Sequence, residues 1–195
     1  MWQTLLDMDK QLLLALNGDG GPFWDNFFYV VSAKLTWIPL YVLLLYCIWR
    51  QMGWRGLLWS IVILGIGVGL ADQICNFFKH YTPKFRPTHT PDIEMWVHTV
   101  RGYRGGPYGT VSAHAAISFT IAVYTALLFR RWWYTAIIVG WALLMAYSRI
   151  YLGVHFPMDI CFGTILGIGV GLGAYRLFMW RIRKGNQTGE LPDKS

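Results

Sequence analysis

Apolar residues gather into five long runs, which are separated by short polar or glycine-containing joints. The runs lie at 27–49, 57–78, 112–129, 132–150 and 158–180. Each is close to the roughly 20 residues that a helix needs to cross the hydrocarbon core of a bilayer. The pattern therefore predicts an all-α fold, a polytopic membrane helical bundle with about five transmembrane helices.

Residues 1–20 show a different pattern, in which apolar residues recur at helical spacing among charged ones. The apolar positions are Trp2, Leu5, Leu6, Leu12, Leu13 and Leu16. A helix with one apolar and one charged face lies in the membrane interface rather than across it. We therefore expect an amphipathic interfacial helix that stops at Asn17-Gly18. It is not a signal peptide, because it lacks a basic start and a continuous apolar core.

Two polar segments complete the organisation. Segment 79–111 is rich in Gly, Pro, Thr and His, and a loop of this length in a compact domain is usually functional or disordered. Residues 181–195 form a polar tail. The predicted parts are thus an interfacial helix at 1–20, a membrane core at 27–180 that contains the loop at 79–111, and a tail at 181–195.

Composition agrees with one membrane domain. The chain has 195 residues, of which 55% are hydrophobic and only 14% are charged, whereas about 25% of a typical soluble domain is charged. Eleven Trp and eleven Tyr suit the aromatic belts at membrane interfaces. Three cysteines, far apart and without CxxC spacing, argue against a disulfide framework or a zinc site.

Charge predicts the orientation. One side of the membrane would hold the amino terminus, the 79–111 loop and the joint before residue 158. This side has eight Lys and Arg and eight acids, a net charge of zero. The other side has nine Lys and Arg and two acids, a net charge of +7. Most cations of the first side cluster near the motifs described below. The positive-inside rule therefore places the carboxyl terminus and the 181–195 tail in the cytoplasm and the 79–111 loop outside. The basic charge is explained by orientation, and no nucleic acid partner is expected.

Three polar motifs lie beside the apolar runs, where charge is costly and usually marks function. They are Lys79-x6-Arg86-Pro87, Ser112-Ala113-His114 and Ser148-Arg149-x5-His155-x3-Asp159. The cations Lys79, Arg86 and Arg149 would repel one another unless an anion lay among them. An arginine offers a planar fork for two phosphate oxygens and a lysine offers a point charge. The motifs therefore predict a phosphate site.

The second motif opens an apolar run, so its backbone amides lie at a helix start. Such amides point at an anion without needing a side chain. Ser112 suits the N-cap position and adds a hydroxyl, and Ala113 adds an amide. In the first motif Pro87 stiffens the backbone beside Arg86.

The histidines carry the chemistry. His155 and Asp159 are four residues apart and share a helix face, and Pro157 between them suits a first helical turn. A carboxylate on one imidazole nitrogen fixes the tautomer and raises the basicity of the other, which makes His155 a nucleophile. His114 can protonate the leaving oxygen and later activate water. This inventory moves a phosphoryl group without a metal or another cofactor.

With these three motifs the chain resembles the type 2 phosphatidic acid phosphatase family of integral-membrane lipid phosphatases. The family signature is K-x6-RP, PSGH and SR-x5-H-x3-D; the first and third motifs are complete here, while the second reads Val111-Ser112-Ala113-His114. The resemblance covers roughly 27–180. It implies a phosphohistidine at His155 with Asp159 in support, proton transfer by His114, and no metal. It also implies phosphate binding by four residues, Lys79, Arg86, Ser112 and Arg149, with Ser148 as a supporting residue.

Two further features add to the site or are set aside. Asp72, Asn76 and Lys79 fall on one helical face, so Asp72 can hold Lys79 in place or make a polar contact between helices. The glycines at 163, 167, 169, 171 and 173 lie within an apolar run with no preceding strand, which excludes a nucleotide loop and favours close helix packing.

We therefore expect a lipid phosphate phosphatase in a bacterial inner membrane, with its site facing the periplasm. Its partners are the bilayer and a phosphorylated lipid, with undecaprenyl pyrophosphate and lipid A as leading candidates. The loop cations Lys84, Arg101 and Arg104 suit a multiply anionic head group such as lipid A, and Arg101, Arg104, Tyr103 and Tyr108 are expected at the pocket rim. The alternatives are a phosphotransferase that uses the same phosphohistidine, a vanadium haloperoxidase-like enzyme, which the apolar runs disfavour, and an inactive lipid-binding scaffold.

Overall fold

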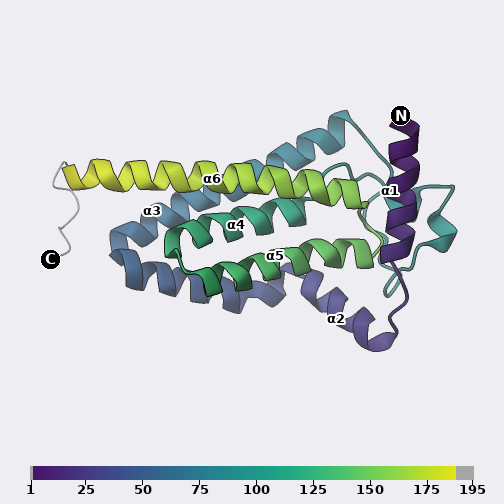
Figure 1. Cartoon of the computed structure of the whole chain (residues 1–195), viewed down its shortest axis with the longest axis horizontal. Helices are drawn as coiled ribbons and strands as arrows, with labels where there is room; N and C mark the ends of the chain where they lie inside the picture. The colour runs from purple at the N-terminus through teal and green to yellow at the C-terminus, as the bar shows by residue number, and fades with distance from the viewer. Residues whose placement is uncertain (1, 188–195) are drawn as a thin grey trace.

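A computed structural model describes residues 2–187, and its regular elements are helices (Figure 1). In chain order they are α1 (Trp2–Leu16), α2 (Pro22–Ser32), η1 (Lys34–Trp37), α3 (Ile38–Tyr81), η2 (Pro87–His89), η3 (Glu94–Trp96), α4 (Ala113–Phe129), α5 (Trp132–Tyr151) and α6 (Pro157–Gln187). The predicted all-α bundle is confirmed. Residues 181–187 of the predicted tail continue α6, and 188–195 lie outside the described residues.

Helix α3 is a hairpin. Gly53 has φ 69° and ψ −177°, a left-handed backbone that glycine adopts without a Cβ penalty. The arms 38–52 and 54–81 therefore run in opposite directions along the bundle (Figure 1). By length and composition, three segments can cross a membrane, Lys34–Tyr81, Trp132–Tyr151 and Pro157–Gly185, and Ala113–Phe129 is a shorter apolar helix. With α3 folded in two, its second arm, α4, α5 and α6 correspond to the last four predicted runs.

The first predicted run, 27–49, differs from the structure because it is not one helix. Helix α2 ends at Ser32, and η1 separates it from α3. Thr36 Oγ1 donates to the Val30 carbonyl at 2.7 Å, and Trp37 Nε1 donates to the Val31 carbonyl at 2.7 Å. These bonds satisfy carbonyls that the end of a helix leaves without partners. The break contains Ser32, Lys34 and Thr36, but apolar residues alternate with them, so the apolar run continues through it in the sequence.

A seam of small residues joins α4 to α6. A Cβ atom on Gly163, Gly167 or Gly171 would collide with a backbone carbonyl of α4, at Ser112, Ala116 and Thr120 respectively. The glycines recur every four residues, so they form one face of α6, as the sequence predicted for close helix packing. The seam brings the first turns of α4 and α6 together, and those turns carry the second and third motifs.

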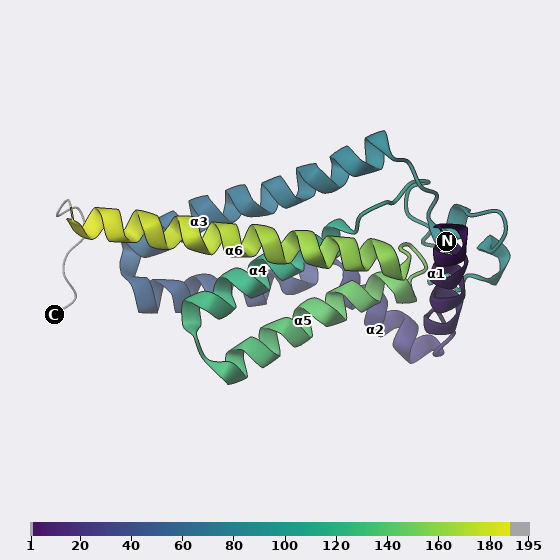
Figure 2. The ribbon, with the colours of Figure 1, turned by 45° about the horizontal axis from the view of Figure 1, so that its top comes forward.

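Helix α1 lies across the end of the bundle, at a steep angle to the long helices (Figures 1 and 2). Asp9 and Leu13 are buried in α1, and Asn17 is buried just after its end, whereas Met8 and Leu12 are exposed. The 79–111 loop lies at the same end, and the C-terminal end of α6 lies at the other. The position of α1 at a membrane interface stays a prediction.

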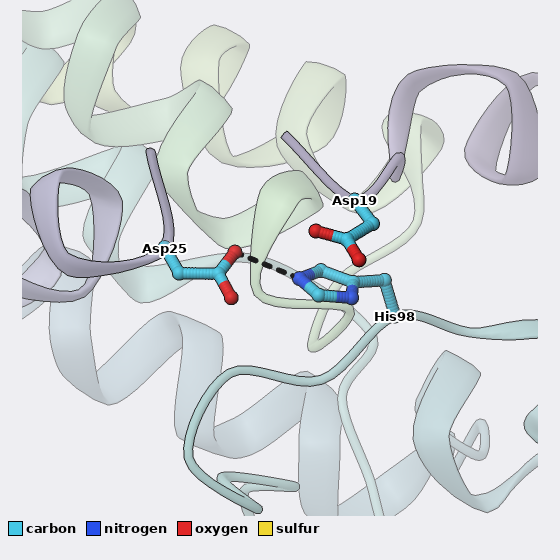
Figure 3. Close-up of side chains that lie close together, drawn as sticks. All are labelled: Asp19, Asp25 and His98. Atoms are coloured by element: carbon cyan, nitrogen blue, oxygen red, sulfur yellow. Dashed lines mark hydrogen bonds and ion pairs between the residues drawn. The ribbon is translucent and has the colours of Figure 1, made fainter. Parts of the chain in front are cut away.

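A polar junction at that end links the loop to α2 (Figure 3) and, through Tyr151, to α5. His98 Nε2 lies 2.9 Å from Asp25 Oδ1, which also accepts the Tyr151 hydroxyl at 2.8 Å. Asp19 lies beside them, and the ligand-type atoms of Asp19, Asp25 and His98 all fall within 4.8 Å of one another. Because Asp25 already forms hydrogen bonds with His98 and Tyr151, we interpret these three residues as a structural contact between the loop and the helices rather than a metal site.

Candidate active site

The third motif forms a tight turn between α5 and α6. The Leu152 amide donates to the Ser148 carbonyl at 3.0 Å and the Val154 amide donates to the Arg149 carbonyl at 3.1 Å. Gly153 has φ 67° and packs so closely on Val97 and His98 that it leaves no room for a Cβ. The turn thereby sets Arg149 at the end of α5 and His155 just before α6.

His155 is almost fully buried, with 4% of its surface exposed. Its Nδ1 lies 3.4 Å from Asp159 Oδ2, and that oxygen also accepts the Phe156 amide at 3.0 Å. Burial lowers the pKa of His155 to about 4, Asp159 opposes this shift, and Arg86 and Arg149 reinforce it. The ring is therefore neutral at neutral pH, with Nε2 left as the free nitrogen.

Arg86 is held beside His155 by a short pairing within the loop. The Arg86 amide donates to the Pro107 carbonyl at 2.9 Å, and the Gly109 amide donates to the Lys84 carbonyl at 2.9 Å. The guanidinium donates to the carbonyls of Tyr108 (3.0 Å) and Val154 (3.3 Å). A Cβ on Gly109 would press on both Arg86 and His155, so this glycine permits their close approach.

Arg149 is the most deeply buried cation of the three motifs, with 3% exposed. Its Nη1 donates to Ser32 Oγ at the end of α2, and its Nη2 donates to the Tyr103 hydroxyl at 3.2 Å. Its Nε has no hydrogen-bond partner among the described residues. Burial raises the pKa of Tyr103 and the nearby arginines lower it, with a net decrease. A buried cation with an unused donor is suited to an anion.

The second motif adopts the predicted helix start. Ser112 is the N-cap of α4, and its side chain accepts the Ala115 amide at 3.4 Å. Ala113 and His114 follow in the first turn and are half-buried. His114 interacts electrostatically with His155, Arg149, Arg86 and Lys34, so the two histidines face the same pair of arginines.

Two predicted site residues lie elsewhere. Lys79 is exposed near the end of α3, where this arm diverges from α6 (Figure 2). It has no hydrogen bond or ion pair within 2–187. Asp72 accepts a hydrogen bond from Asn76 Nδ2 at 3.1 Å and does not contact Lys79. The expected Asp72–Lys79 contact is therefore absent from the described residues.

The supporting residues have local roles. Pro87 is buried and begins η2 directly after Arg86. Ser148 Oγ donates to the Met145 carbonyl at 2.7 Å within α5, so its hydroxyl is engaged inside its own helix. Both residues shape the backbone that carries an arginine.

Of the predicted rim, Tyr103 reaches the site. Arg101 Nη2 donates to Asn26 Oδ1 at 2.7 Å and its guanidinium lies 4.7 Å from the Tyr29 ring centre. Arg104 Nη2 donates to Glu94 Oε2 at 2.7 Å, and the Tyr108 ring stacks on Phe85. Both arginines therefore have protein partners in this structure.

The sequence reading missed the role of two charged residues beside Asp159. Lys84 Nζ lies 3.0 Å from Asp159 Oδ1 and 3.2 Å from Asp9 Oδ2. The sequence predicts that Lys84 meets a head group, and it assigns Asp9 no role in the site. In the structure Lys84 contacts the Asp159 carboxylate directly, and Asp9 contacts Lys84.

His114 also lines an apolar cavity of about 300 Å³. Its lining comes from η1, α3, α4 and α5 and includes Lys34, Tyr41, Val68, Ile117, Trp141 and Met145. A second apolar cavity of similar size shares Tyr41, Val68 and Ile121 with it and continues between the α3 arms to Ile48 and Ser60. His114 thus lies between the two arginines of the site and an apolar cavity.

Fold and site together define a membrane-type helical bundle in which two arginines and two histidines meet at one end. Residues 56–183 match the PAP2 superfamily, and the chain belongs to that superfamily. The predicted family and the predicted enzyme class, a phosphatase, are confirmed.

The relatives support the same assignment. The lipid A 4'-phosphatase of Bacteroides thetaiotaomicron is 38% identical over 91% of this chain and 79% of its own length. The lipid A 4'-phosphatase of Porphyromonas gingivalis is 37% identical over 91% and 76%. The crystal structure of Aquifex aeolicus LpxE superposes with a TM-score of 0.68, at 24% identity over 85% of this chain and 93% of that one; this likeness concerns the fold.

Proposed function

We propose that the chain removes a phosphate monoester from a lipid A-type glycolipid through a phosphohistidine on His155. The observation that carries this proposal is the position of His114. It interacts electrostatically with Arg86, Arg149 and the carboxylate-bonded His155, and it also lines an apolar cavity. Two relatives that are lipid A 4'-phosphatases, each aligned with 91% of the chain, support this choice of substrate.

In the proposed reaction, His155 Nε2 attacks phosphorus while the bond to the sugar oxygen breaks. Arg86 and Arg149 bind the phosphate oxygens, and the Arg149 Nε donor, the Ser112 hydroxyl and the Ala113 amide add to them. His114 gives its proton to the leaving oxygen. It lines the apolar cavity, so the leaving group would lie on the side where acyl chains fit.

A water molecule then attacks the phosphohistidine. His114, now neutral, takes a proton from the water as the P–N bond breaks, and inorganic phosphate leaves. Asp159 holds the His155 tautomer through both steps, so that Nδ1 carries the hydrogen and Nε2 remains the nucleophile. Lys79 stays a proposed phosphate ligand, reached if the diverging end of α3 moves inward.

Phosphate release in detergent tests this function. We expect the purified full chain to release phosphate from bisphosphorylated lipid A faster than from undecaprenyl pyrophosphate, phosphatidylglycerophosphate or phosphatidic acid, and His155→Ala to release none. Preference for undecaprenyl pyrophosphate would contradict the proposed substrate. Appearance of the phosphate on an added lipid or sugar acceptor, rather than in water, would indicate a phosphotransferase.

We also propose a bacterial inner-membrane location, with the site in the periplasm and the carboxyl terminus in the cytoplasm. The net +7 of the second side supports it. In a variant with its three cysteines replaced by alanine, a new cysteine at Gly106 should react with an impermeant thiol reagent in spheroplasts. A reporter fused after residue 195 should be active only in the cytoplasm. The reverse result in both assays would overturn the orientation.

A further inference from the structure

A buried bridge of charges connects α1 to the active-site carboxylate. Lys84 Nζ lies between Asp9 Oδ2 (3.2 Å) and Asp159 Oδ1 (3.0 Å). The side chains of Asp9 and Asp159 are 2% and 0% exposed, whereas that of Lys84 is 29% exposed. Within residues 2–187, Lys84 is the only lysine or arginine paired with either carboxylate.

Each residue of this bridge has further contacts that hold it in place. Asp9 Oδ1 accepts the Met158 amide at 2.9 Å, in the first turn of α6. Lys84 Nζ also lies 4.2 Å from the centre of the Phe156 ring. Each oxygen of Asp159 has its own partner, because Oδ1 meets Lys84 and Oδ2 meets His155 and the Phe156 amide. Lys84 is therefore engaged inside the site and is not a free cation for the head group.

Removing any member would change the net charge around the others. Two buried carboxylates that face one cation carry a net charge of −1, and without the cation their mutual repulsion would be uncompensated. An Asp159 side chain turned away by that repulsion would no longer hold Nδ1 of His155. Loss of one partner from a buried ion pair leaves an uncompensated charge and is strongly destabilising.

We propose that Asp9 and Lys84 are positioning residues, which hold the Asp159 carboxylate aimed at His155. The amphipathic helix α1 is then part of the catalytic apparatus as well as a membrane anchor. This inference rests on the proposed function, in which His155 is the nucleophile.

The chain offers a matched control on the same helix. Lys10, the next residue after Asp9, pairs with Asp92 of the loop at 2.9 Å. That pair also links α1 to the loop, but Asp92 is exposed, with 72% of its side chain accessible, and neither residue contacts Asp159. Lys10→Met removes an α1–loop contact without touching the bridge.

The first test compares Asp9→Asn, Lys84→Met, their double variant and Lys10→Met in phosphate release from lipid A. In metal sites, where carboxylates orient histidines, loss of such a supporting partner lowers metal affinity or activity about 10–100-fold. We expect Lys84→Met to lower kcat by a similar factor and to change KM little. The double variant should recover part of the loss, because it removes one charge of each sign. Lys84→Arg should keep more activity than Lys84→Met, and Lys10→Met should match the wild type.

The second readout is the acidic limb of the pH profile of kcat/KM. The groups that face His155 are Asp159 of α6, Arg86 of the loop, Arg149 of α5 and His114 of α4. Asn at position 9 can still accept the Met158 amide, so Asp9→Asn removes charge while keeping the helix docked. Lys84 would then be less neutralised, and the limb should move to lower pH; Lys10→Met should leave it in place.

The outcomes separate the two proposals. No phosphate release by the wild-type chain would refute the proposed function. An active wild type, with Asp9→Asn and the double variant equal to Lys10→Met in kcat and in pH profile, would overturn the positioning role alone. If Lys84→Met does not fold, these two variants decide the question.

Discussion

The main-chain amide of Ser112 donates to the main-chain carbonyl of Asp159 at 3.0 Å. This bond joins the helix start of the second motif to the first turn of the third. It exists because the glycine face of α6 lets the backbone of α4 come close, with Gly163 directly against the Ser112 carbonyl. The packing of two membrane helices therefore sets the relative position of His114 and His155.

The seam can be tested by adding a single methyl group. A Cβ on Gly167 would collide with the Ala116 carbonyl, whereas a Cβ on Gly169 has nothing within 4 Å. Overpacking of a close interface lowers the free energy of unfolding by about 1–3 kcal/mol. Gly167→Ala should therefore lower the Tm in detergent and reduce activity. Gly169→Ala should retain both. Equal melting temperatures for the two variants would show that the seam is not tightly packed.

The pKa of His155 predicts an unusual acidic limit. Burial lowers this pKa to about 4 in the folded protein, below the usual 6.5. His155 is therefore neutral and nucleophilic above about pH 4, and the acidic limb of kcat/KM should lie near that value. Asp159 raises this pKa, so Asp159→Asn should shift the limb still lower. Substrate ionisation is common to both enzymes and cancels in the comparison. A limb near 6.5 that Asp159→Asn leaves unmoved would contradict this reading.

The same shift affects stability. Between about pH 4 and 6.5, the unfolded chain binds a proton at His155 that the folded chain does not. Stability contributed by this group therefore rises with pH across that window and is constant above it. In His155→Gln this part of the pH dependence of Tm should disappear.

Hydrolysis should persist in EDTA. The proposed phosphate ligands are cations and amides, and the carboxylate nearest to His155 is already bonded to His155, Lys84 and the Phe156 amide. A divalent metal at this position would meet Arg86 and Arg149 instead of the oxygen ligands that it prefers. We expect equal initial rates with and without an excess of chelator. Loss of activity in EDTA, restored by a divalent metal, would refute the metal-free mechanism.

The local parts of the site could be predicted from the sequence. His155 and Asp159 are four residues apart, and a helix start at Ser112 follows from its side chain and the run behind it. The bridge could not, because Asp9 and Lys84 are separated by 75 positions and each resembles an ordinary surface charge. Helix periodicity also placed Asp72 and Lys79 on one face, but it carries no information about the direction in which that arm of α3 leaves the bundle.

The two histidines should respond differently to an activated substrate. If His155 is the nucleophile, His155→Ala should abolish turnover of every substrate and any trapped phosphoenzyme. His114→Ala removes the general acid that protonates the leaving group, and general acid catalysis raises the rate about 10²–10⁴-fold. With lipid A, whose sugar oxygen is a poor leaving group, His114→Ala should be nearly inactive. With an aryl phosphate, whose leaving group needs little protonation, activity should partly return in His114→Ala and not in His155→Ala. The motivating contrast is that Asp159 lies 3.4 Å from His155 Nδ1, while His114 has no bonded carboxylate among the described residues. Rescue of His155→Ala instead would exchange the two roles.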